Sequence, residues 1–554
     1  MHLAPSTAWA WLISCAVVIL LFPLAAQFGN LKGKLSSFRT WVWAIALLGI
    51  VTAGFMPFTF DTDITRFEVQ PFIFFITGTL LGALFLGEFH RLNAQKKLKH
   101  PQRVHAERRT RYSKAVEQLA YPNPAVRASA ISTLAGLVDE WLADEQLSVE
   151  ARQKEGQVVV NALCAYVRSP FSRAFKTEAF ESDAPPANYA GDFATDLAAF
   201  RGEQDVRRSI FVEMSKRSST LAENEKGEVA VVPGAWSGFE FDFSRAVVFY
   251  PLDGLTIENA DFSAAKFCNG SDFSGAAFVG TVDFSRAAFG EIAGFGDATF
   301  AGDANFSHAT FTHSADFGGA SFIQSAHFDG VKFMQKAHFG GVEFTRDTNF
   351  TGVAFIQNAS FGGVNFARNA DFCWAVFAQN AHFIGAVFGQ IADFSGATFT
   401  QNARFSETAF AQVARFKWAT FTQTADFSEA AFTQGADFSE STFEADAEFY
   451  GASFMGAADF CDVSFVKSPP LFAVEDADSG EVRRARFAAL SAGSETAGQE
   501  AHNFAVYEDS QPIPLGTARM DGVEYRIPVG AVLFDPVSWD ERQKEYTCLS
   551  EPSQ

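Results

Sequence analysis

The sequence predicts an α+β multidomain protein in which three N-terminal transmembrane helices, a small helical domain and a long β-helix follow one another. Three observations predict this class. Apolar runs fill much of residues 1–90, apolar residues recur at helical spacing within residues 91–170, and an eleven-residue repeat occupies residues 255–465. A chain of 554 residues is long enough for two or more domains. Residues 466–554 complete the chain as a C-terminal cap or tail.

Phenylalanine marks the repeat, and the chain holds 64 of these residues. Phe394, Phe399, Phe405 and Phe410 follow one another at alternating gaps of five and six residues, and the pattern continues in both directions. About nineteen copies of the unit stand in succession, which is typical of repeat architectures, where each unit packs on its neighbours.

Each unit indicates short extended segments separated by turns. A small apolar residue stands two positions before each phenylalanine, as Ala392 does before Phe394, and residues two apart on a strand face the same side. Alanine and phenylalanine therefore point inward together, while the residue between them, Asp393, points outward. Small or polar residues such as Ser395 and Gly396 then form a turn. Stacked coils of this kind bury a column of Phe and Ala side chains.

The segment Ala392-Asp393-Phe394-Ser395-Gly396 resembles the pentapeptide repeat, which has Ala, then Asp or Asn, then Leu or Phe, and then two variable residues. The resemblance implies a right-handed quadrilateral β-helix for the repeat, which covers roughly two fifths of the chain. Each eleven-residue repeat thus joins one five-residue segment to one six-residue segment. A four-sided coil would therefore hold about twenty-two residues, with the extra residue, Asn402 for example, at a corner. A different number of sides per coil stays open.

Composition limits the chemistry that the chain can perform. The net charge is −21 and the isoelectric point is near 4.9. The cysteines stand singly and form no Cys-x-x-Cys pair, so neither a zinc ribbon nor a thioredoxin-type site is indicated. Free thiols in a reducing cytosol are expected. These residues are Cys15, Cys164, Cys268, Cys373, Cys461 and Cys548.

Three apolar runs predict membrane-spanning helices at residues 8–28, 41–60 and 71–89. Each run approaches the roughly 20 residues that cross a bilayer, and tryptophans such as Trp9 and Trp41 stand near run ends, where interfacial aromatic residues are enriched. The first run lacks a basic segment before it, so we do not expect a cleaved signal peptide.

Charges in the connecting segments predict the orientation of these helices. Basic residues separate the first two runs, acidic residues separate the second from the third, and a basic segment follows residue 90. By the positive-inside rule, the N-terminus lies outside a bacterial inner membrane and the repeat lies in the cytoplasm. The basic segment either fixes this topology against anionic headgroups or binds a nucleic acid or a partner. Because it lacks a base-reading motif, we favour the first. Its basic residues are Arg91, Lys96, Lys97, Lys99, Arg103, Arg108, Arg109, Arg111 and Lys114.

Two further segments connect this anchor to the repeat. Residues 91–170 combine the basic segment with a helical block, in which Asn123 caps a helix that begins at Pro124. Residues 171–254 form a linker and an N-terminal cap. There, a helix from Asp205 and an aromatic run cover the first open coil, since an uncapped end exposes unpaired backbone. The aromatic run consists of Phe239, Phe241 and Phe243.

The helical block also resembles the corresponding region of bacterial membrane-anchored pentapeptide repeat proteins, in which transmembrane segments, helices and the repeat follow in this order. The similarity is carried by residues 111–119, 125–127 and 163–168, with Ala120 where those proteins have glycine. This resemblance implies no common activity.

The sequence contains no catalytic constellation: GxSxG, P-loop, GxGxxG and HExxH motifs are absent. We therefore expect a non-enzymatic protein without a cofactor or a resident metal. His338 and His382 point outward two coils apart, roughly 10 Å, which is too far to share a metal at Zn–N distances of about 2 Å.

Two surface patterns of the repeat carry information about stability and recognition. Trp374 and Trp418 both stand at the second turn position after a phenylalanine, two coils apart, so both project from one face with space above Gly396 between them. Two aligned tryptophans with a gap indicate a partner groove.

Glutamines also recur every eleven residues, and alternate members form amide ladders that stabilise the layers, with ligand contact as the less favoured alternative. These are Gln379, Gln390, Gln401, Gln412, Gln423 and Gln434.

The charge of the repeat leads to two functional hypotheses. It carries 23 acidic and 9 basic residues, and Arg404, Arg415 and Lys417 mix with the acids in one patch. We predict a membrane-tethered, non-enzymatic protein-interaction scaffold. Its partner is an unidentified protein, and no direct nucleic-acid binding is expected. The alternative is a DNA mimic that binds a topoisomerase, because an anionic rod attracts clefts that bind phosphates. The candidate partner surface comprises Trp374, Trp418, Arg404, Arg415 and Lys417.

Overall fold

The chain divides into two compact units, Met1–Arg111 and Tyr112–Gln554. Most of helix α3 (Arg66–Leu119) belongs to the first unit, while the helical block, the repeat and the C-terminal region belong to the second. All candidate site residues lie in the second unit. The computed structural model describes residues 66–223, 229–268, 272–475, 480–490, 502–540 and 545–554.

The predicted membrane anchor is not supported. Within the described part of the chain, no helix has the length and apolar character that crossing a bilayer requires. The predicted span at residues 71–89 is part of α3, which continues without interruption through the basic segment, so this apolar run does not form a separate helix. The predicted spans at residues 8–28 and 41–60 lie outside the described residues. The prediction of three transmembrane helices is therefore corrected: the class is a β-solenoid with a small helical domain.

The helical domain begins as the sequence predicts. Pro124 opens α4, and the Asn123 side chain accepts a hydrogen bond from the Ala125 amide at 2.9 Å. The last helix, α6, starts well before the predicted Asp205, because the Asp192 side chain accepts hydrogen bonds from the backbone and hydroxyl of Thr195. The helices are α4 (Pro124–Leu142), α5 (Val149–Arg168), the 3-10 helix η2 (Ser172–Phe180) and α6 (Phe193–Ser215).

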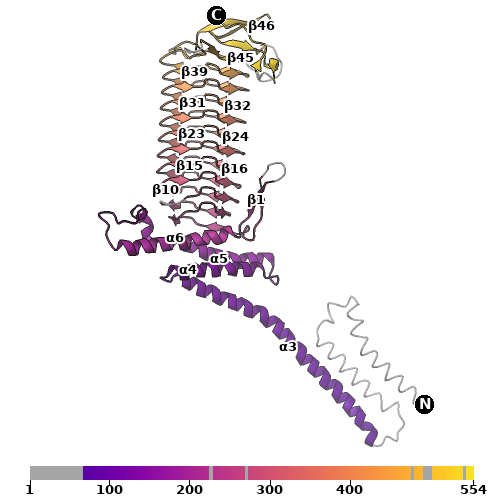
Figure 1. Cartoon of the computed structure of the whole chain (residues 1–554). Helices are drawn as coiled ribbons and strands as arrows, with labels where there is room; N and C mark the ends of the chain where they lie inside the picture. Colours follow the sequence, from indigo (N-terminus) through magenta and orange to yellow (C-terminus); the bar gives the residue numbers. More distant parts are fainter. Residues whose placement is uncertain (1–65, 224–228, 269–271, 476–479, 491–501, 541–544) are drawn as a thin grey trace, which may run out of the picture. The chain divides into compact units, whose positions relative to one another are not determined.

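The repeat folds into a four-sided β-solenoid of about 10 coils (Figure 1). Each complete coil places one two-residue strand in each of four parallel sheets. One coil consists of β29 (Ala392–Asp393), β30 (Thr398–Phe399), β31 (Ala403–Arg404) and β32 (Ala409–Phe410), and we name the four faces after these strands. Neighbouring strands of a face pair 22 residues apart, which confirms the predicted coil length and its four sides.

The strands begin ahead of the predicted boundary at residue 255 and continue beyond residue 465, because flanking segments join the same sheets. The β29 face runs from β3 (Phe241–Asp242) to β41 (Ala458–Asp459), the β30 face from β4 (Val247–Val248) to β42 (Ser464–Phe465), the β31 face from β11 (Ala293–Gly294) to β39 (Ala447–Glu448), and the β32 face from β5 (Thr256–Ile257) to β48 (Val532–Phe534).

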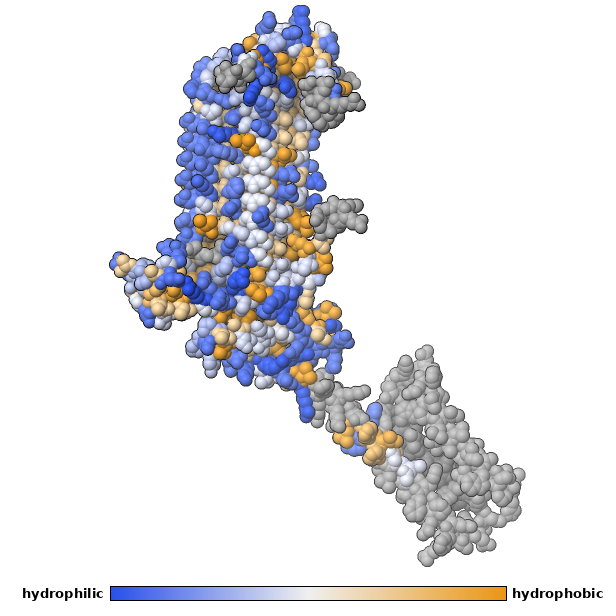
Figure 2. Space-filling model, in the orientation of Figure 1, coloured by the Kyte–Doolittle hydropathy of each residue, from blue (hydrophilic) through white to orange (hydrophobic). Residues whose placement is uncertain are grey.

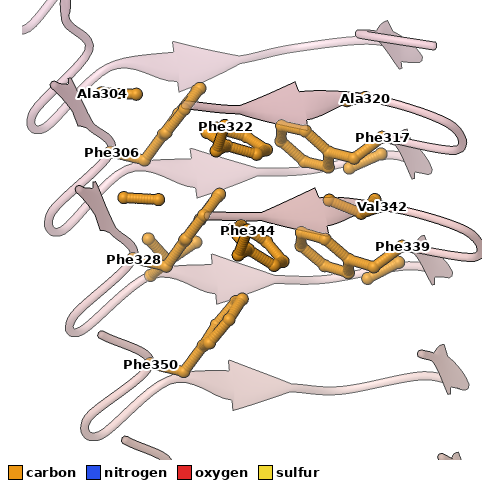
Figure 3. Packing of buried hydrophobic residues seen from close by; sticks show 14 of the residues in the cluster. Ala304, Phe306, Phe317, Ala320, Phe322, Phe328, Phe339, Val342, Phe344 and Phe350 are labelled. Carbon is orange, nitrogen blue, oxygen red and sulfur yellow. The ribbon is translucent and has the colours of Figure 1, made fainter. Parts of the chain in front are cut away.

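Columns of phenylalanine rings fill the solenoid, as Figure 3 shows. Phe306 and Phe328, one coil apart, are stacked with ring centroids 5.0 Å apart and planes inclined by 2°. Phe317 meets Phe306 edge to face at 5.6 Å. All three rings are buried, with alanines such as Ala304 filling the remaining interior. The predicted inward orientation of Phe and Ala is thus confirmed, and both ring geometries are favourable beyond simple area burial.

Two kinds of turn connect the faces. The shorter turn follows β29 and β31 strands: the Ala397 amide donates to the Phe394 carbonyl at 3.0 Å, and Gly396 has a φ of 68°, as in a type II turn. The longer turn contains the additional residue at a corner, as predicted. There, the Asn380 amide donates to the Asn358 side chain of the preceding coil at 3.3 Å. This hydrogen bond between successive coils involves the residue directly after the glutamine position at which the sequence predicted an amide ladder.

Helix α6 covers the N-terminal end of the solenoid, as expected. Its Phe211 ring lies 4.7 Å from Phe243, at the start of the phenylalanine columns, and both rings are buried. The predicted aromatic run is itself the start of the first coil, since Phe241 belongs to β3. A hairpin of β1 (Thr220–Glu223) and β2 (Val229–Val232) lies between α6 and this coil in sequence.

The C-terminal region covers the other end of the solenoid (Figure 1). Two of its strands extend the β32 face by parallel pairing, and the Phe460 amide donates to the Asn503 carbonyl at 2.8 Å. The region is a cap, one of the two predicted possibilities. Its elements are β43 (Ala473–Glu475), β44 (Val482–Arg484), β45 (Arg486–Ala488), β46 (Leu515–Met520), β47 (Val523–Pro528), β48, η3 (Pro536–Ser538), β49 (Trp539–Asp540) and β50 (Glu545–Tyr546).

Replacing one core ring tests the packing. Phe394→Ala removes a ring that stacks on Phe372 at 4.8 Å and on Phe416 at 5.1 Å, so it leaves a cavity and lowers local stability by about 3–5 kcal/mol. The outward-facing Thr398→Ala is the control. Thermal melting and amide exchange of the adjacent coils provide the measurement. An unchanged melting temperature for Phe394→Ala would contradict the inward phenylalanine column.

The C-terminal cap should weaken in mild acid. The His502 ring accepts a hydrogen bond from the Ala458 amide at 3.2 Å and bonds the Ala488 carbonyl at 3.0 Å through its other nitrogen. Burial lowers the pKa of His502, while the Ala488 bond opposes the shift. The unfolded chain therefore takes up a proton more readily, and stability falls as the pH drops below about 6.5. His502→Gln should flatten this part of the pH–melting curve, and an equally steep curve in both proteins would contradict the assignment.

Candidate partner-binding surface

The two candidate tryptophans lie in one corner of the solenoid. The corner between the β29 and β30 faces is formed by the left-handed turn residues Gly352, Trp374, Gly396, Trp418 and Glu440, one from each successive coil. We call this column the Trp corner. Trp374 and Trp418 are 62% and 49% exposed, so the predicted projection of both side chains from one edge, two coils apart, is confirmed.

The backbone of both tryptophans is in an unfavourable conformation. Trp374 and Trp418 each have a φ of 58°, in the left-handed region, as do other non-glycine residues at this turn position, including His308 and Glu440. Glycine occupies the equivalent position at Gly352 and Gly396, as expected for a turn that requires positive φ. Left-handed backbone costs a residue with a side chain roughly 1–2 kcal/mol. Because this conformation recurs at the turns, the large exposed side chains of Trp374 and Trp418, rather than the strain alone, single out these two positions.

Trp374 fills the space that the sequence left open above Gly396. A Cβ atom added to Gly396 would lie 2.6 Å from Cε3 of the Trp374 ring, so the indole lies directly against the glycine backbone of the next coil. The predicted gap between the tryptophans is therefore occupied by one of them. Val376, which follows on the β30 face, is also exposed. The result is an exposed aromatic shelf rather than an open groove.

Trp418 is held by charged neighbours instead of glycine. Its indole N–H donates to Glu440 Oε2 at 2.8 Å, and Lys417 Nζ lies 4.6 Å from its ring centroid and 3.1 Å from Glu440 Oε1. The Trp418 and Lys417 contacts lower the pKa of Glu440. Sequence reasoning missed Glu440, although the 22-residue register puts it next to Trp418 in the following coil.

The structure separates the basic residues that the sequence placed in one patch. Arg415 lies on the β29 face, beside the Trp corner, and its Nη1 is 3.2 Å from Asp393 Oδ2. Arg404 lies on the β31 face. Because the four strands of a coil follow in order around the column, the β31 face is opposite the β29 face. Arg415 and Lys417 therefore border the Trp corner, and Arg404 does not.

Many acidic residues of the β29 face hold turns. Asp393 Oδ1 accepts hydrogen bonds from the Ser395 amide at 3.0 Å and hydroxyl at 2.5 Å, which is the geometry of an Asx turn. Burial alone would raise the pKa of Asp393, but these hydrogen bonds outweigh burial and lower it. Asp371 accepts from the Cys373 amide at 2.8 Å in the same way. Part of the negative charge of the repeat thus comes from aspartates that stabilise its turns.

The outward histidines do not assemble a metal site. His338 and His382 lie on the β31 face in strands that both pair with β23 (Ala359–Ser360), so they stand two coils apart with one coil between them, as predicted. Burial, followed by the nearby Arg404, lowers the pKa of His382. Over the part of the chain that the structure describes, no group of three His, Cys, Asp or Glu side chains is placed to hold a metal ion.

The fold and its turn chemistry define the class: a β-solenoid whose phenylalanine-filled coils are built from paired five- and six-residue units. The family model for pentapeptide repeats matches residues 284–332, 328–372, 375–417 and 419–464. The repeat domain is therefore a pentapeptide-repeat β-solenoid, as the sequence resemblance implied. No curated protein and no solved structure matches the chain.

Replacing Trp374 by glycine should not weaken the fold. Trp374→Gly removes left-handed strain of roughly 1–2 kcal/mol together with a largely exposed side chain, so the melting temperature should stay level or rise. Trp374→Ala loses the same indole but keeps the strain, so it should melt below Trp374→Gly. Thermal melting of the two variants provides the comparison. A large loss of stability in both would make Trp374 a structural residue instead of a recognition residue.

Proposed function

We propose that this protein is a non-enzymatic interaction scaffold whose Trp corner contacts a protein partner. The observation that carries the proposal is the alignment of two exposed tryptophans in one corner of the solenoid, at turn positions where the coil between them has glycine. Exposed tryptophans are frequent centres of binding energy at protein interfaces. The pentapeptide-repeat solenoid supports them on a column of buried rings, so the surface needs little ordering when a partner binds.

The proposed surface comprises Trp374, Trp418, Arg415 and Lys417, to which we add Glu440. The scaffold role requires no membrane anchor. The predicted location of the repeat in the cytoplasm is not tested by the fold and stays a prediction.

DNA mimicry is the weaker proposal. The repeat carries a net charge of about −14, which favours attraction to phosphate-binding clefts. Near the Trp corner, however, Arg415 and Lys417 are paired with Asp393 and Glu440, so the charge there is partly neutralised. Inhibition of topoisomerase supercoiling by the full chain at low salt, lost at high salt, would favour mimicry.

Site-specific crosslinking tests the scaffold. A photoreactive phenylalanine analogue at position 374 or 418 of the full chain should capture the same protein partner. The same analogue at position 404, exposed on the opposite β31 face, is the matched control and should not capture it. Capture of one partner from all three positions, or from none, would contradict a role specific to the Trp corner.

A pair of glycine variants tests the shelf without removing a tryptophan. Gly396→Ala forces the Trp374 ring to move, because the new Cβ would lie 2.6 Å from it. Gly352→Ala introduces the same left-handed strain with nothing within 4 Å of the new Cβ. Capture from position 418 should fall in Gly396→Ala and persist in Gly352→Ala. Equal capture in the two variants would show that the position of the Trp374 ring does not matter.

A further inference from the structure

The two tryptophans of the Trp corner occupy the same turn position in coils 44 residues apart but have different neighbours. At Trp418, the preceding residue is Lys417, and the corner residue of the next coil is Glu440. At Trp374, the preceding residue is Cys373, and the next corner residue is Gly396. The chain thus contains one tryptophan with a cation and a carboxylate around it and a second one without them.

The neighbours of Trp418 show what this ring position can hold. Lys417 Nζ lies 4.6 Å from the ring centroid, within the range of a cation–π contact, and its charge is paired with Glu440 at 3.1 Å. Tryptophan is the aromatic residue that attracts cations most strongly, and a carboxylate that faces the same cation adds a charge-assisted hydrogen bond. Trp418 is therefore a cation site that the chain itself fills.

Trp374 has the same ring position but has Cys373 and Gly396 in place of the lysine and the glutamate. The Cys373 thiol stands where Lys417 supplies its ammonium group, and burial, followed by the carboxylates of Asp371 and Asp393, raises the pKa of that thiol, so it stays neutral. The indole lies across Gly396, and the residue is 62% exposed. An incoming side chain can therefore reach the ring.

Asp371 and the acidic coils beyond Trp418 favour a cation from outside. Asp371 and Asp393 lie on the adjacent β29 face; Asp393 is already paired with Arg415, whereas Asp371 accepts a hydrogen bond from the Cys373 amide through one oxygen. The coils beyond Trp418 add further acid, since residues 419–465 contain acidic residues but no lysine or arginine. A basic segment that continues from Trp374 past Trp418 therefore reaches these acidic coils, beyond the Arg415 and Lys417 ion pairs.

We propose that the Trp374 shelf binds an arginine or lysine side chain presented by a basic, extended segment of the partner protein. The inference rests on the proposed scaffold function and names the chemistry of the partner. The cationic group stacks on the exposed ring of Trp374, and the neighbouring Asp371 carboxylate offsets its charge. Trp418 contributes less, because Lys417 already occupies its ring.

Fluorescence anisotropy with the full-length protein tests the inference. The probe is a short labelled peptide that alternates arginine with serine, and the comparison peptides carry glutamine or glutamate in place of each arginine. The arginine peptide should bind most tightly and lose affinity as salt is raised. Trp374→Leu keeps apolar bulk but removes the ring, and should weaken arginine-peptide binding by about two- to fivefold, the contribution of an exposed cation–π contact.

Two substitutions with matched controls separate the site from net charge. Cys373→Lys supplies an internal cation next to Trp374 and should weaken peptide binding more than Ile384→Lys, which adds the same charge at the equivalent turn position of the opposite corner. Lys417→Ala frees the Trp418 ring and Glu440, and should strengthen binding more than Arg404→Ala on the β31 face.

The outcomes distinguish this inference from the function on which it rests. Unchanged affinity in Trp374→Leu, or equal effects within each charge-matched pair, would overturn the cation site. Binding of the glutamine or glutamate peptide that depends on Trp374 and equals or exceeds that of the arginine peptide would also overturn it. That last result would leave the Trp corner standing as a partner surface, which the crosslinking experiment tests separately.

Discussion

The 22-residue register of the coil is the constraint on which the rest of the structure depends. Ring stacking, parallel strand pairing and the side-chain ladder of the longer turns all require this register at once. The Phe394 ring stacks on Phe372, the strand of Asp393 pairs with the strand of Asp371, and the Asn380 amide donates to the Asn358 side chain, each across one coil. A shift by a single five- or six-residue segment would place a five-residue segment beside a six-residue one and break all three. Positions 22 residues apart in sequence therefore become neighbours in space.

This register turns the surface into stripes. Figure 2 shows nearly neutral stripes that run along the long axis of the repeat, while hydrophilic residues cover much of the same face. Each stripe is one position of the unit repeated from coil to coil. Because the inward positions are almost uniformly Phe and Ala, any recognition has to come from outward positions and turns. The Trp corner departs most strongly from the pattern, since it places large rings where neighbouring coils have glycine.

The sequence predicted the features that follow from periodicity. Coil length, inward Phe394 and the alignment of Trp374 with Trp418 all follow from counting residues, because the fold repeats what the sequence repeats. The same counting could have shown that Arg404 and Arg415, eleven residues apart, lie half a coil from each other and hence on opposite faces. Treating closeness in sequence as closeness in space produced that error.

Features without periodicity could not be predicted in this way. The membrane-span prediction used only the hydropathy of residues 71–89, which does not show that the helix continues to Leu119. The C-terminal cap has no repeat, and its strands β45 and β48 join the β32 face through pairings between distant segments. The direction in which Trp374 leans, across Gly396, depends on a side-chain torsion that no pattern of residue types records.

The most direct test of the account is a distance along one face. Ala354 and Ser464 both point outward on the β30 face, in strands separated by five successive pairings. Spin labels at these positions, in a background without other reactive cysteines, should give one narrow distribution of label-to-label distances. Its centre should lie at about 24 Å, since five layers of about 4.8 Å each separate the two strands. A broad distribution, or one centred well away from that distance, would contradict the 22-residue stacked coil.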